Sequence, residues 1–506
     1  MKKKTNIWVV IVIFAIIKLA IHLITNTNYG LQRDAYLYYS LGQNLAWGYV
    51  SAPPFIAVLA RISTAIFGNT VFALRLFPAL IGSLSVIIIG KIIIELKGEE
   101  LAAIIALTAF TLTTSFLRSN TLFQPVSFNQ FFWLLSFYFV IKLIKTQEPV
   151  YWLHIFIVWG IGFLNKYSMA FVIFSTLLAI LLTSNRKLFR LRYFFIGGVI
   201  SVLIILPNLV WQYNHNWPVI HHMSELQKSQ LVNITISGFL VDQLTMNIPA
   251  IFVWLVGLIG LLFIKSLKKY RPIAYAYLGT VLIIILLKGK SYYTLGLYST
   301  LFAFGGYTID KYFKSGLKFL ILSLVILIAI PLLPISLPVL SHQEIASYTE
   351  PIASLTNQWE DGEVHNIPQD YADMTGWKEL SSIVIRHYNS LPAKARENCL
   401  IFTENYGQAG AIYFYGKGMG LPRPISFSDN FLLWAPESID VSSLIYVNDQ
   451  VDDIAHLFGS IEKIGQVDNK YFREDGLKVY YCTQPAVGLK KFYRNKIDNL
   501  KRKYQR

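Results

Sequence analysis

The chain has 506 residues, of which 54% are hydrophobic and only 15% are charged, and its mean hydropathy is +0.47. This composition excludes a large soluble enzyme and predicts a membrane protein with several spans. The net charge of +16 does not indicate nucleic-acid binding, because the basic residues stand in short clusters between apolar segments. Two cysteines exclude a disulfide scaffold and a cysteine-based zinc site, and leave Cys399 and Cys482 either as one disulfide or as two unpaired thiols.

About eleven apolar segments predict transmembrane helices, since a helix needs about 17–25 residues to cross the hydrocarbon core and a buried helix can be shorter. These segments are residues 7–26, 71–95, 101–117, 127–144, 151–165, 167–183, 193–210, 248–264, 272–288, 294–309 and 317–340. We therefore expect residues 1–340 to form a transmembrane domain.

The basic residues predict the orientation of these spans. The N-terminus, MKKKT, precedes the first apolar segment, and no small-residue cleavage site follows that segment, so we expect an uncleaved first span with its lysines in the cytoplasm. Four basic loops then all fall on the cytoplasmic side, as the positive-inside rule requires. They are Lys142/Lys145, Arg186/Lys187/Arg190/Arg192, Lys265/Lys268/Lys269/Arg271 and Lys311/Lys314/Lys318.

Two loops on the predicted outer side are too long for simple connections. The first, residues 27–70, has apolar or aromatic residues at helical spacing over residues 34–47 and, after Pro53 and Pro54, over residues 54–67. We expect two interfacial helices there, lying at the membrane surface. The second loop, residues 211–247, contains WQYNHNW and the pair His221-His222.

From about residue 341 the hydrophobic runs shorten, and turn sequences such as Asp361-Gly362 break the chain. We predict a soluble α/β domain over residues 341–506, on the outer side because an odd number of spans precedes it. Its expected strands are residues 399–403, 444–448 and 477–483, and its expected helices are residues 376–388 and 450–457. A basic amphipathic helix over residues 489–506 could rest on anionic lipid or form a solvated tail.

Asp34 is the first candidate for chemistry. It follows Arg33 just after the first predicted span. An Arg-Asp pair at this place is often a plain ion pair or a helix N-cap. A carboxylate at the membrane surface can equally activate or orient an acceptor hydroxyl group, so these two residues alone leave both interpretations open.

The sequence around Asp34 resembles a known family. The resemblance is carried by RDAYLYYSLGQNLAWGYVSAPPFIAVLARI, VFALRLFPALIGSL, GFLNKYSM, LPNLVWQYNHNWP, GKSYYTLGLY, DMTGWKEL, ENYGQAGAIYFYG and SFSDNFLLW, and it runs over nearly the whole chain. These segments are similar to the bacterial branch of the protein O-mannosyltransferase-like (PMT-like) glycosyltransferases, glycosyltransferase family 39, which are related to the lipid A aminoarabinose transferases.

This resemblance implies a multispanning α-helical GT-C fold in a bacterial cytoplasmic membrane. It also implies an inverting transfer of a sugar from a polyprenyl-phosphate-linked donor to a lipid, glycan or protein acceptor on the outer face. The essential acid of the family's first outer loop corresponds to Asp34, and Arg33 would keep that carboxylate ionised and aligned. Membrane lipids are further expected partners and nucleic acid is not; no cofactor is expected, although a divalent metal could take part.

Three positions depart from the family pattern. Many relatives have Glu after the Arg-Asp pair, where this chain has Ala35, and many have a second acid near the outer end of the fourth span, where this chain has Asn129. An amide can orient a hydroxyl group but cannot carry the charge, so activity, metal use or acceptor choice could differ here. The lysine that the aminoarabinose transferases place before Pro-Pro is replaced by Ala52.

The remaining candidates concern the donor. Lys166, Lys290, Tyr292 and Tyr293 could contact its phosphate, with Arg61 as a weaker choice, and this role depends mainly on the resemblance. Lysines near an interface commonly snorkel, and tyrosines there commonly belong to the aromatic belt. Trp211 and His222 could contact the sugar; the spacing of the loop histidines does not match the HExxH pattern of zinc sites.

Three other functions remain open from the sequence. A lipid-linked sugar transporter would show internal repeats and a midplane acid, and neither is apparent here. A polysaccharide polymerase or ligase would use a related, diphosphate-linked donor. A degenerate member without catalytic activity would explain Ala35 and Asn129.

Overall fold

The computed structural model describes residues 6–190, 192–229 and 231–505. The chain divides into two compact units. Unit 1 comprises Met1–Asn26, Leu74–Leu209 and Leu226–Val339, and unit 2 comprises Thr27–Ala73, Val210–Glu225 and Leu340–Arg506. The first predicted outer loop and part of the second thus belong to the same unit as the C-terminal segment. The lysines of MKKKT, on which the predicted orientation begins, lie outside the described residues.

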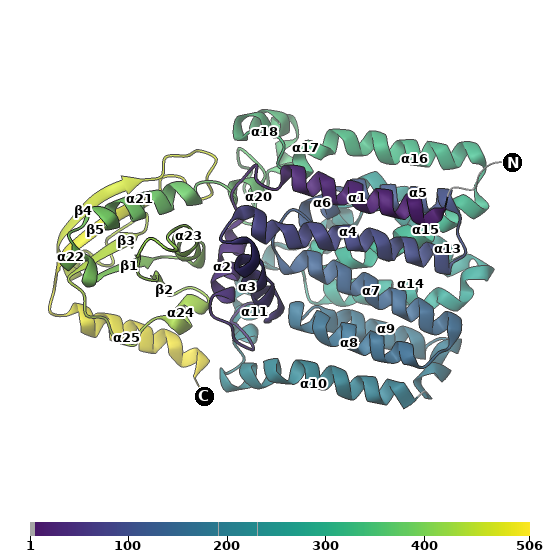
Figure 1. Ribbon diagram of the computed structural model, residues 1–506, viewed down its shortest axis with the longest axis horizontal. Helices are drawn as coiled ribbons and strands as arrows, with labels where there is room; N and C mark the ends of the chain where they lie inside the picture. Colours follow the sequence, from purple (N-terminus) through teal and green to yellow (C-terminus); the bar gives the residue numbers. More distant parts are fainter. Residues whose placement is uncertain (1–5, 191, 230, 506) are drawn as a thin grey trace. The chain divides into compact units, whose positions relative to one another are not determined.

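Unit 1 is a bundle whose long helices run roughly parallel to one another (Figure 1). Each of the predicted apolar segments contains a helix. The helices are α1 (Ile7–Thr25), α4 (Val71–Glu95), α5 (Glu100–Leu112), α6 (Thr114–Ser119), α7 (Pro125–Thr146), α8 (Val150–Asn165), α9 (Met169–Leu181), α10 (Arg192–Asn214), α12 (Ile236–Thr245), α13 (Ile251–Phe263), α14 (Arg271–Leu286), α15 (Tyr298–Tyr312), α16 (Ser315–Ala329) and α17 (Leu333–Ser336).

The chain is a multi-pass helical protein, but the expected count of about eleven spans is not established. Among the described residues, 6 helices are long and apolar enough to cross a membrane, or up to 8 if each of two bent helix pairs forms one span. The other apolar helices are shorter than a full crossing requires. Helices α5 and α15, for example, have 13 and 15 residues and are buried along most of their length.

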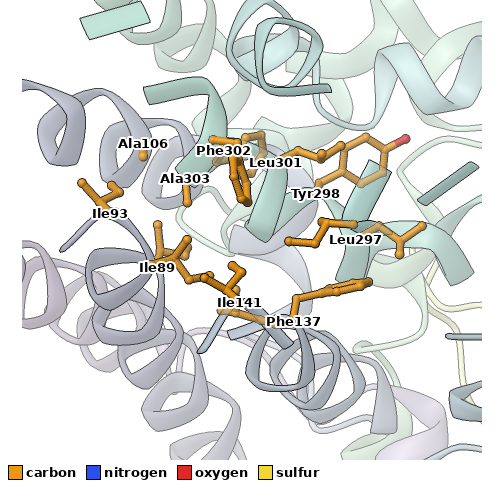
Figure 2. Close-up of a cluster of buried hydrophobic side chains, with 14 of the residues drawn as sticks. Ile89, Ile93, Ala106, Phe137, Ile141, Leu297, Tyr298, Leu301, Phe302 and Ala303 are labelled. Atoms are coloured by element: carbon orange, nitrogen blue, oxygen red, sulfur yellow. The ribbon is translucent and has the colours of Figure 1, made fainter. Parts of the chain in front are cut away.

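The core of unit 1 contains large aliphatic and aromatic side chains from α4, α5, α7 and α15, which Figure 2 shows in close-up. Glycines allow two of the helices to approach very closely. A Cβ atom on Gly305 of α15 would lie 2.0 Å from the backbone oxygen of Val253, and one on Gly257 of α13 would lie 2.2 Å from that of Leu301. Small residues at such contacts are typical of helix packing in membranes.

Unit 2 contains a five-stranded sheet with the order β2-β1-β3-β5-β4. Strand β1 is parallel to β2 and β3, whereas β5 is antiparallel to β3 and β4. The strands are β1 (Cys399–Thr403), β2 (Ile425–Ser426), β3 (Ser443–Val447), β4 (Phe458–Gln466) and β5 (Lys478–Pro485). The three predicted strands are present. Strand β4 was not predicted because it lies at the sheet edge, where polar residues replace the apolar alternation of a buried strand.

Helices cover both faces of this sheet, with α21 and α25 on opposite sides of it (Figure 1). The helices of unit 2 are α2 (Arg33–Gly42), α3 (Phe55–Phe67), α11 (Pro218–Ser229), α18 (His342–Thr349), α19 (Ala353–Thr356), α20 (Gln369–Ala372), α21 (Trp377–Ser390), α22 (Ala393–Glu397), α23 (Tyr406–Tyr415), α24 (Asn430–Trp434) and α25 (Leu489–Lys501). The expected helix over residues 450–457 is wrong, since only the 3₁₀ turn Ala455–Leu457 forms there.

Helix α25 is neither a solvated tail nor a free amphipathic helix. Leu489, Tyr493 and Ile497, spaced four residues apart, are buried in a cluster with side chains of the sheet. The segment after it is held as well, because Lys503 forms an ion pair of 2.9 Å with Glu225.

Helix α2 is buried, which differs from the expectation of a helix lying on the membrane surface. Seven of its 10 residues are buried, because α2 packs between α3 and α23. Glycines permit both contacts: a Cβ on Gly410 of α23 would lie 2.8 Å from the backbone of Tyr36, and one on Gly42 would lie 2.8 Å from the oxygen of Ala57. The first turn of α2 is therefore fixed against the start of α23. Helix α3 does expose an apolar face, with Val58, Ile62 and Ile66 on it.

Cys399 and Cys482 are both free and buried. Cys399 lies on β1 and Cys482 on β5, and β3 separates these two strands in the sheet. Two strand spacings amount to about 10 Å, which exceeds the Cα separation of about 7 Å that a disulfide tolerates. The alternative of two unpaired thiols is therefore correct.

Candidate active site

Asp34 lies in the first turn of α2, and Gln32 caps that helix. The backbone N–H of Asp34 donates to Gln32 Oε1 at 2.8 Å, and Gln32 Nε2 donates to Asp373 Oδ2 at 3.1 Å. A carboxylate in the first turn is favoured by the partial positive charge at a helix N-terminus. The Asp34 side chain is 31% exposed, so it is held by its backbone and yet accessible.

The hydroxyl group of Tyr406 connects Arg33 with Asp34. It donates to Asp34 Oδ1 at 2.8 Å and accepts a hydrogen bond of 2.6 Å from Arg33 Nη2. The direct contact between Arg33 Nε and Asp34 Oδ1 is long, at 3.9 Å. Arg33 therefore acts on the carboxylate mainly through Tyr406. A Cβ on Gly407 would lie 2.6 Å from Arg33 Cγ, so a glycine at this position is what allows Arg33 to reach Tyr406.

The pKa values of Tyr406 and Arg33 favour this arrangement. Burial and the negative charge of Asp34 raise the pKa of Tyr406 well above its ordinary value, so the hydroxyl group keeps its proton and donates a hydrogen bond to the carboxylate. Burial lowers the pKa of Arg33, but Tyr406, Asp34 and Asp373 raise it by more, so the guanidinium group stays charged.

Asp373 accepts the hydrogen bond from Gln32 Nε2 and so fixes the residue that caps α2. It is 2% exposed, and its Oδ1 accepts a hydrogen bond of 2.9 Å from Arg473 Nη1. Burial raises the pKa of Asp373 to about 6, although the charges of Arg473 and Arg33 oppose this shift. The result is a buried array of polar groups, drawn from three distant segments, that fixes the first turn of α2.

A second carboxylate, Asp429, interacts electrostatically with Asp34 and with His222. Asp429 has φ of +50°, which is uncommon for a residue with a Cβ atom, and caps the short helix α24 through a 2.7 Å bond from Asn430 N–H. Burial raises the pKa of Asp429, while His222 and a hydrogen bond with Ser51 lower it. The sequence prediction missed Asp429, although it stands within the quoted motif SFSDNFLLW.

Three other predicted residues belong to unit 2. Arg61 Nη1 donates to Gln43 Oε1 at 3.3 Å. The indole ring of Trp211 stacks on His215, with 4.0 Å between ring centroids and 17° between planes, so one face of this ring is already covered. His222, on α11, is half-buried and interacts with Asp429.

The predicted phosphate-binding residues belong to unit 1, and the structure brings three of them together. Lys166, at the end of α8, lies with its Nζ 4.4 Å from the ring centroid of Tyr293 and 5.2 Å from that of Tyr292. Lys290 directly precedes the 3₁₀ turn Ser291–Leu297 that carries both tyrosines. Asn129, on α7, is 4% exposed, and its Oδ1 accepts no hydrogen bond from the described part of the chain.

The comparison with protein families concerns part of the N-terminal half of the chain. Residues 51–211 match the family described as dolichyl-phosphate-mannose-protein mannosyltransferase. This match agrees with the resemblance to the PMT-like glycosyltransferases that the sequence motifs carry.

A similar curated protein is the lipid A galacturonosyltransferase RgtD of Rhizobium johnstonii, which is 28% identical to this chain over 200 residues. The match covers 38% of this chain and 41% of that protein, so the chain spans about two fifths of the curated relative's length.

Solved structures with the same fold cover almost the entire chain. ArnT from Cupriavidus metallidurans, bound to undecaprenyl phosphate, is similar with a TM-score of 0.63 and 13% identity, over 94% of this chain and 97% of that one. The archaeal oligosaccharyltransferase AglB from Archaeoglobus fulgidus, in complex with an inhibitory peptide and a dolichol-phosphate, has a TM-score of 0.50 and 12% identity, over 88% and 70% of the two chains. At these identities the likeness establishes the fold.

Proposed function

We propose that this PMT-like protein is a glycosyltransferase that moves a sugar from a polyprenyl-phosphate-linked donor to a lipid, glycan or protein acceptor. The family match and the similarity to a lipid A galacturonosyltransferase support the reaction type. The fold shared with ArnT bound to undecaprenyl phosphate supports a lipid-linked donor. The basic loops between the spans support a site at the outer face of a bacterial cytoplasmic membrane, with the N-terminus in the cytoplasm.

Asp34 is the proposed catalytic carboxylate. In an inverting transfer, the acceptor hydroxyl group attacks the anomeric carbon of the sugar, its proton passes to Asp34, and the bond from that carbon to the phosphate oxygen breaks. The phosphate leaves on the polyprenyl carrier. Arg33 and Tyr406 are positioning residues in this scheme, because they hold Oδ1 of Asp34 and so direct the rest of the carboxylate.

The departing phosphate requires positive charge and hydrogen-bond donors. Lys166 and Lys290 are proposed to supply the charge, and Tyr292 and Tyr293 to supply hydroxyl groups, an assignment supported by the gathering of Lys166 with both rings. Asn129 is proposed to orient a hydroxyl group through its buried amide oxygen. Trp211 and His222 remain candidates for contact with the sugar, and no cofactor or metal takes part in the proposed reaction.

The observation that carries this proposal is the state of Asp34: a partly exposed carboxylate whose Oδ1 is fixed by the half-buried Tyr406 and, through it, by the half-buried Arg33. A plain surface ion pair would not need a hydroxyl group from a residue 372 positions away. Such fixed geometry is the requirement for general base catalysis.

The proposal can be tested in cells that lack the protein. Mass spectrometry should find one polyprenyl-phosphate sugar accumulated and one sugar missing from the cell-surface glycans or lipids, with both changes reversed by the wild-type gene. Unchanged donor and surface sugars would contradict a transferase function. Loss of the sugar without accumulation of its donor on the outer leaflet would instead indicate a transporter.

A further inference from the structure

A single buried amide connects α12 with the 3₁₀ turn Ser291–Leu297, which carries two of the proposed phosphate ligands. Gln243, on α12, is 4% exposed. Its Oε1 accepts a hydrogen bond of 2.6 Å from Thr294 Oγ1 and one of 2.8 Å from the hydroxyl group of Tyr298. Thr294 lies inside the turn, Tyr298 follows it directly, and both are buried. One oxygen atom of α12 thus holds the turn at two points.

Other contacts orient this amide. Gln243 Nε2 donates to the backbone oxygen of Phe239, one turn earlier on α12, at 3.2 Å. The hydroxyl group of Tyr298 is also 3.4 Å from that of Tyr277, on α14. Because Tyr298 donates its one proton to Gln243, Tyr277 is the donor in this second contact. Figure 2 shows the hydroxyl group of Tyr298 directed away from the labelled apolar side chains. Gln243 therefore accepts at the end of a chain of buried hydroxyl groups.

The turn has an apolar contact as well, but this contact does not fix its orientation. A Cβ atom on Gly296 would lie 2.7 Å from the ring of Trp133, on α7, so the turn packs closely on that ring. Apolar packing limits the approach of two groups and is non-directional. The directional restraints from α12 are the two hydrogen bonds to Gln243 and one to Asp242, whose Oδ2 accepts from Ser291 Oγ at 2.5 Å.

The position of the turn decides where the proposed phosphate ligands lie. Lys166 Nζ is 4.4 Å from the ring centroid of Tyr293 and 5.2 Å from that of Tyr292. Lys166 follows α8, whereas both tyrosines belong to the turn. A shift of the turn would therefore move the tyrosine hydroxyl groups relative to the ammonium group. A displacement of about 1 Å can lower the rate of a reaction by about a hundredfold.

We propose that Gln243 is a positioning residue for the departing phosphate. Through Thr294 and Tyr298, it keeps the turn beside Lys166 in the geometry that the leaving group requires. Gln243 itself is buried and touches neither substrate in this scheme. The inference rests on the proposed function and extends it to a residue outside the substrate contacts.

Steady-state kinetics with the full chain in membranes tests the proposal, with the donor varied at a fixed acceptor concentration. Gln243→Leu removes the oxygen that accepts from both hydroxyl groups. We expect this variant to raise the KM for the donor by at least about fivefold and to lower kcat by about tenfold, because the phosphate is held in both the bound and the transition state. Gln243→Glu keeps an oxygen atom at the same place and should stay within about threefold of the wild type in both constants.

A matched control separates this effect from a loss of stability. Asn185→Leu also replaces a buried amide that connects two segments of unit 1, since Asn185 Nδ2 donates to the backbone oxygen of Lys269 at 3.0 Å. Neither residue belongs to the proposed site. Thermal unfolding is measured for both leucine variants, and Asn185→Leu should keep KM and kcat within about twofold of the wild type. If Gln243→Leu does not fold, Thr294→Val removes one of its two hydrogen bonds and should raise the KM for the donor by about twofold to fivefold.

A double-mutant cycle gives a second measurement that lower stability would not affect. Lys166→Gln should cost about tenfold in turnover alone, but about threefold or less in the Gln243→Leu background, because the displaced turn no longer holds the phosphate against Lys166. Additive losses, or an unchanged KM for the donor in Gln243→Leu, would overturn the inference and leave the proposed function standing. An equal rise of KM in Asn185→Leu would overturn it too. Wild-type turnover of Lys166→Gln alone would overturn the phosphate assignment, and this inference with it.

Discussion

Replacing Tyr406 with Phe removes a single oxygen atom from the proposed site and leaves the packed ring in place. That oxygen accepts from Arg33 Nη2 at 2.6 Å and donates to Asp34 Oδ1 at 2.8 Å. In the variant, the backbone N–H of Asp34 still donates to Gln32 Oε1, but the carboxylate loses a hydrogen bond that fixes its side chain. We therefore expect Asp34 to lose its orientation while the fold of α2 is preserved.

The size of the effect follows from the charges of Arg33 and Asp34, the two groups that the Tyr406 hydroxyl group contacts. A hydrogen bond to a charged group contributes about 1.5–3 kcal/mol, and the bond to Asp34 is of this kind. If nearly all of it orients the carboxylate in the transition state, turnover should fall by about 10-fold to 100-fold, because each 1.4 kcal/mol corresponds to a factor of ten. The apparent KM for the donor should stay within about twofold, since Tyr406 contacts no proposed donor-binding residue in unit 2.

The assay compares turnover in membranes that contain wild-type or variant protein, with the donor identified by mass spectrometry. Tyr415→Phe is the matched control: it lies on the same helix, α23, and removes a hydrogen bond of 3.1 Å between its hydroxyl group and that of Tyr36. The control should lose less than about threefold, because both of these groups are neutral. Equal losses in the two variants would mean that the hydroxyl groups merely stabilise α23, and full activity of Tyr406→Phe would refute the positioning role.

Three further predictions concern charge and metal. Lys166→Gln should lower turnover by about tenfold. Lys268→Gln, which changes an exposed lysine in the same unit, should have no effect on turnover. Equal turnover in the two variants would exclude Lys166 from phosphate contact. Burial raises the pKa of Asp373 to about 6 from 3.8, so the protonated side chain that the folded state favours is lost as pH rises. The unfolding free energy of the wild type should therefore fall by about 2 kcal/mol relative to that of Asp373→Asn between pH 4 and 7. A thermal unfolding difference that does not change with pH would contradict this pKa. Chelation by EDTA should leave turnover within about twofold, and a loss restored by a divalent metal would show that a cofactor is required.

The helices of unit 1 could be predicted because their signal is local. An apolar segment of membrane-spanning length predicts a helix without reference to any other segment, and every expected segment contains one. The number of complete crossings could not be predicted in the same way. Hydropathy does not distinguish a span from a shorter helix such as α5, whose burial depends on neighbours far away in the sequence.

The partners of Asp34 could not be predicted because they are distant. Tyr406 is separated from Asp34 by 372 positions, and Asp373 from Gln32 by 341. Each lies in a motif that signalled the family, DMTGWKEL or ENYGQAGAIYFYG, but no local pattern connects these motifs to the first outer loop. The two glycines of α23 that permit this contact, Gly407 and Gly410, have no function that a sequence pattern reveals.

The composition of unit 2 also changes how the C-terminal segment should be studied. Residues 340–506 form one unit with residues 27–73, which contain Asp34. Deleting the chain after residue 341 would therefore remove Tyr406 and Asp373 from the proposed catalytic carboxylate. Such a deletion cannot separate acceptor use from catalysis, whereas point substitutions such as Tyr406→Phe can.

The central claim is that Asp34 takes the proton of the acceptor, and turnover by Asp34→Asn tests it most directly. The amide keeps the size and the hydrogen-bonding oxygen of the carboxylate but lacks its charge. We predict that the variant loses at least about 99% of turnover and still binds the polyprenyl-phosphate sugar with wild-type affinity. Wild-type turnover in this variant would contradict the account.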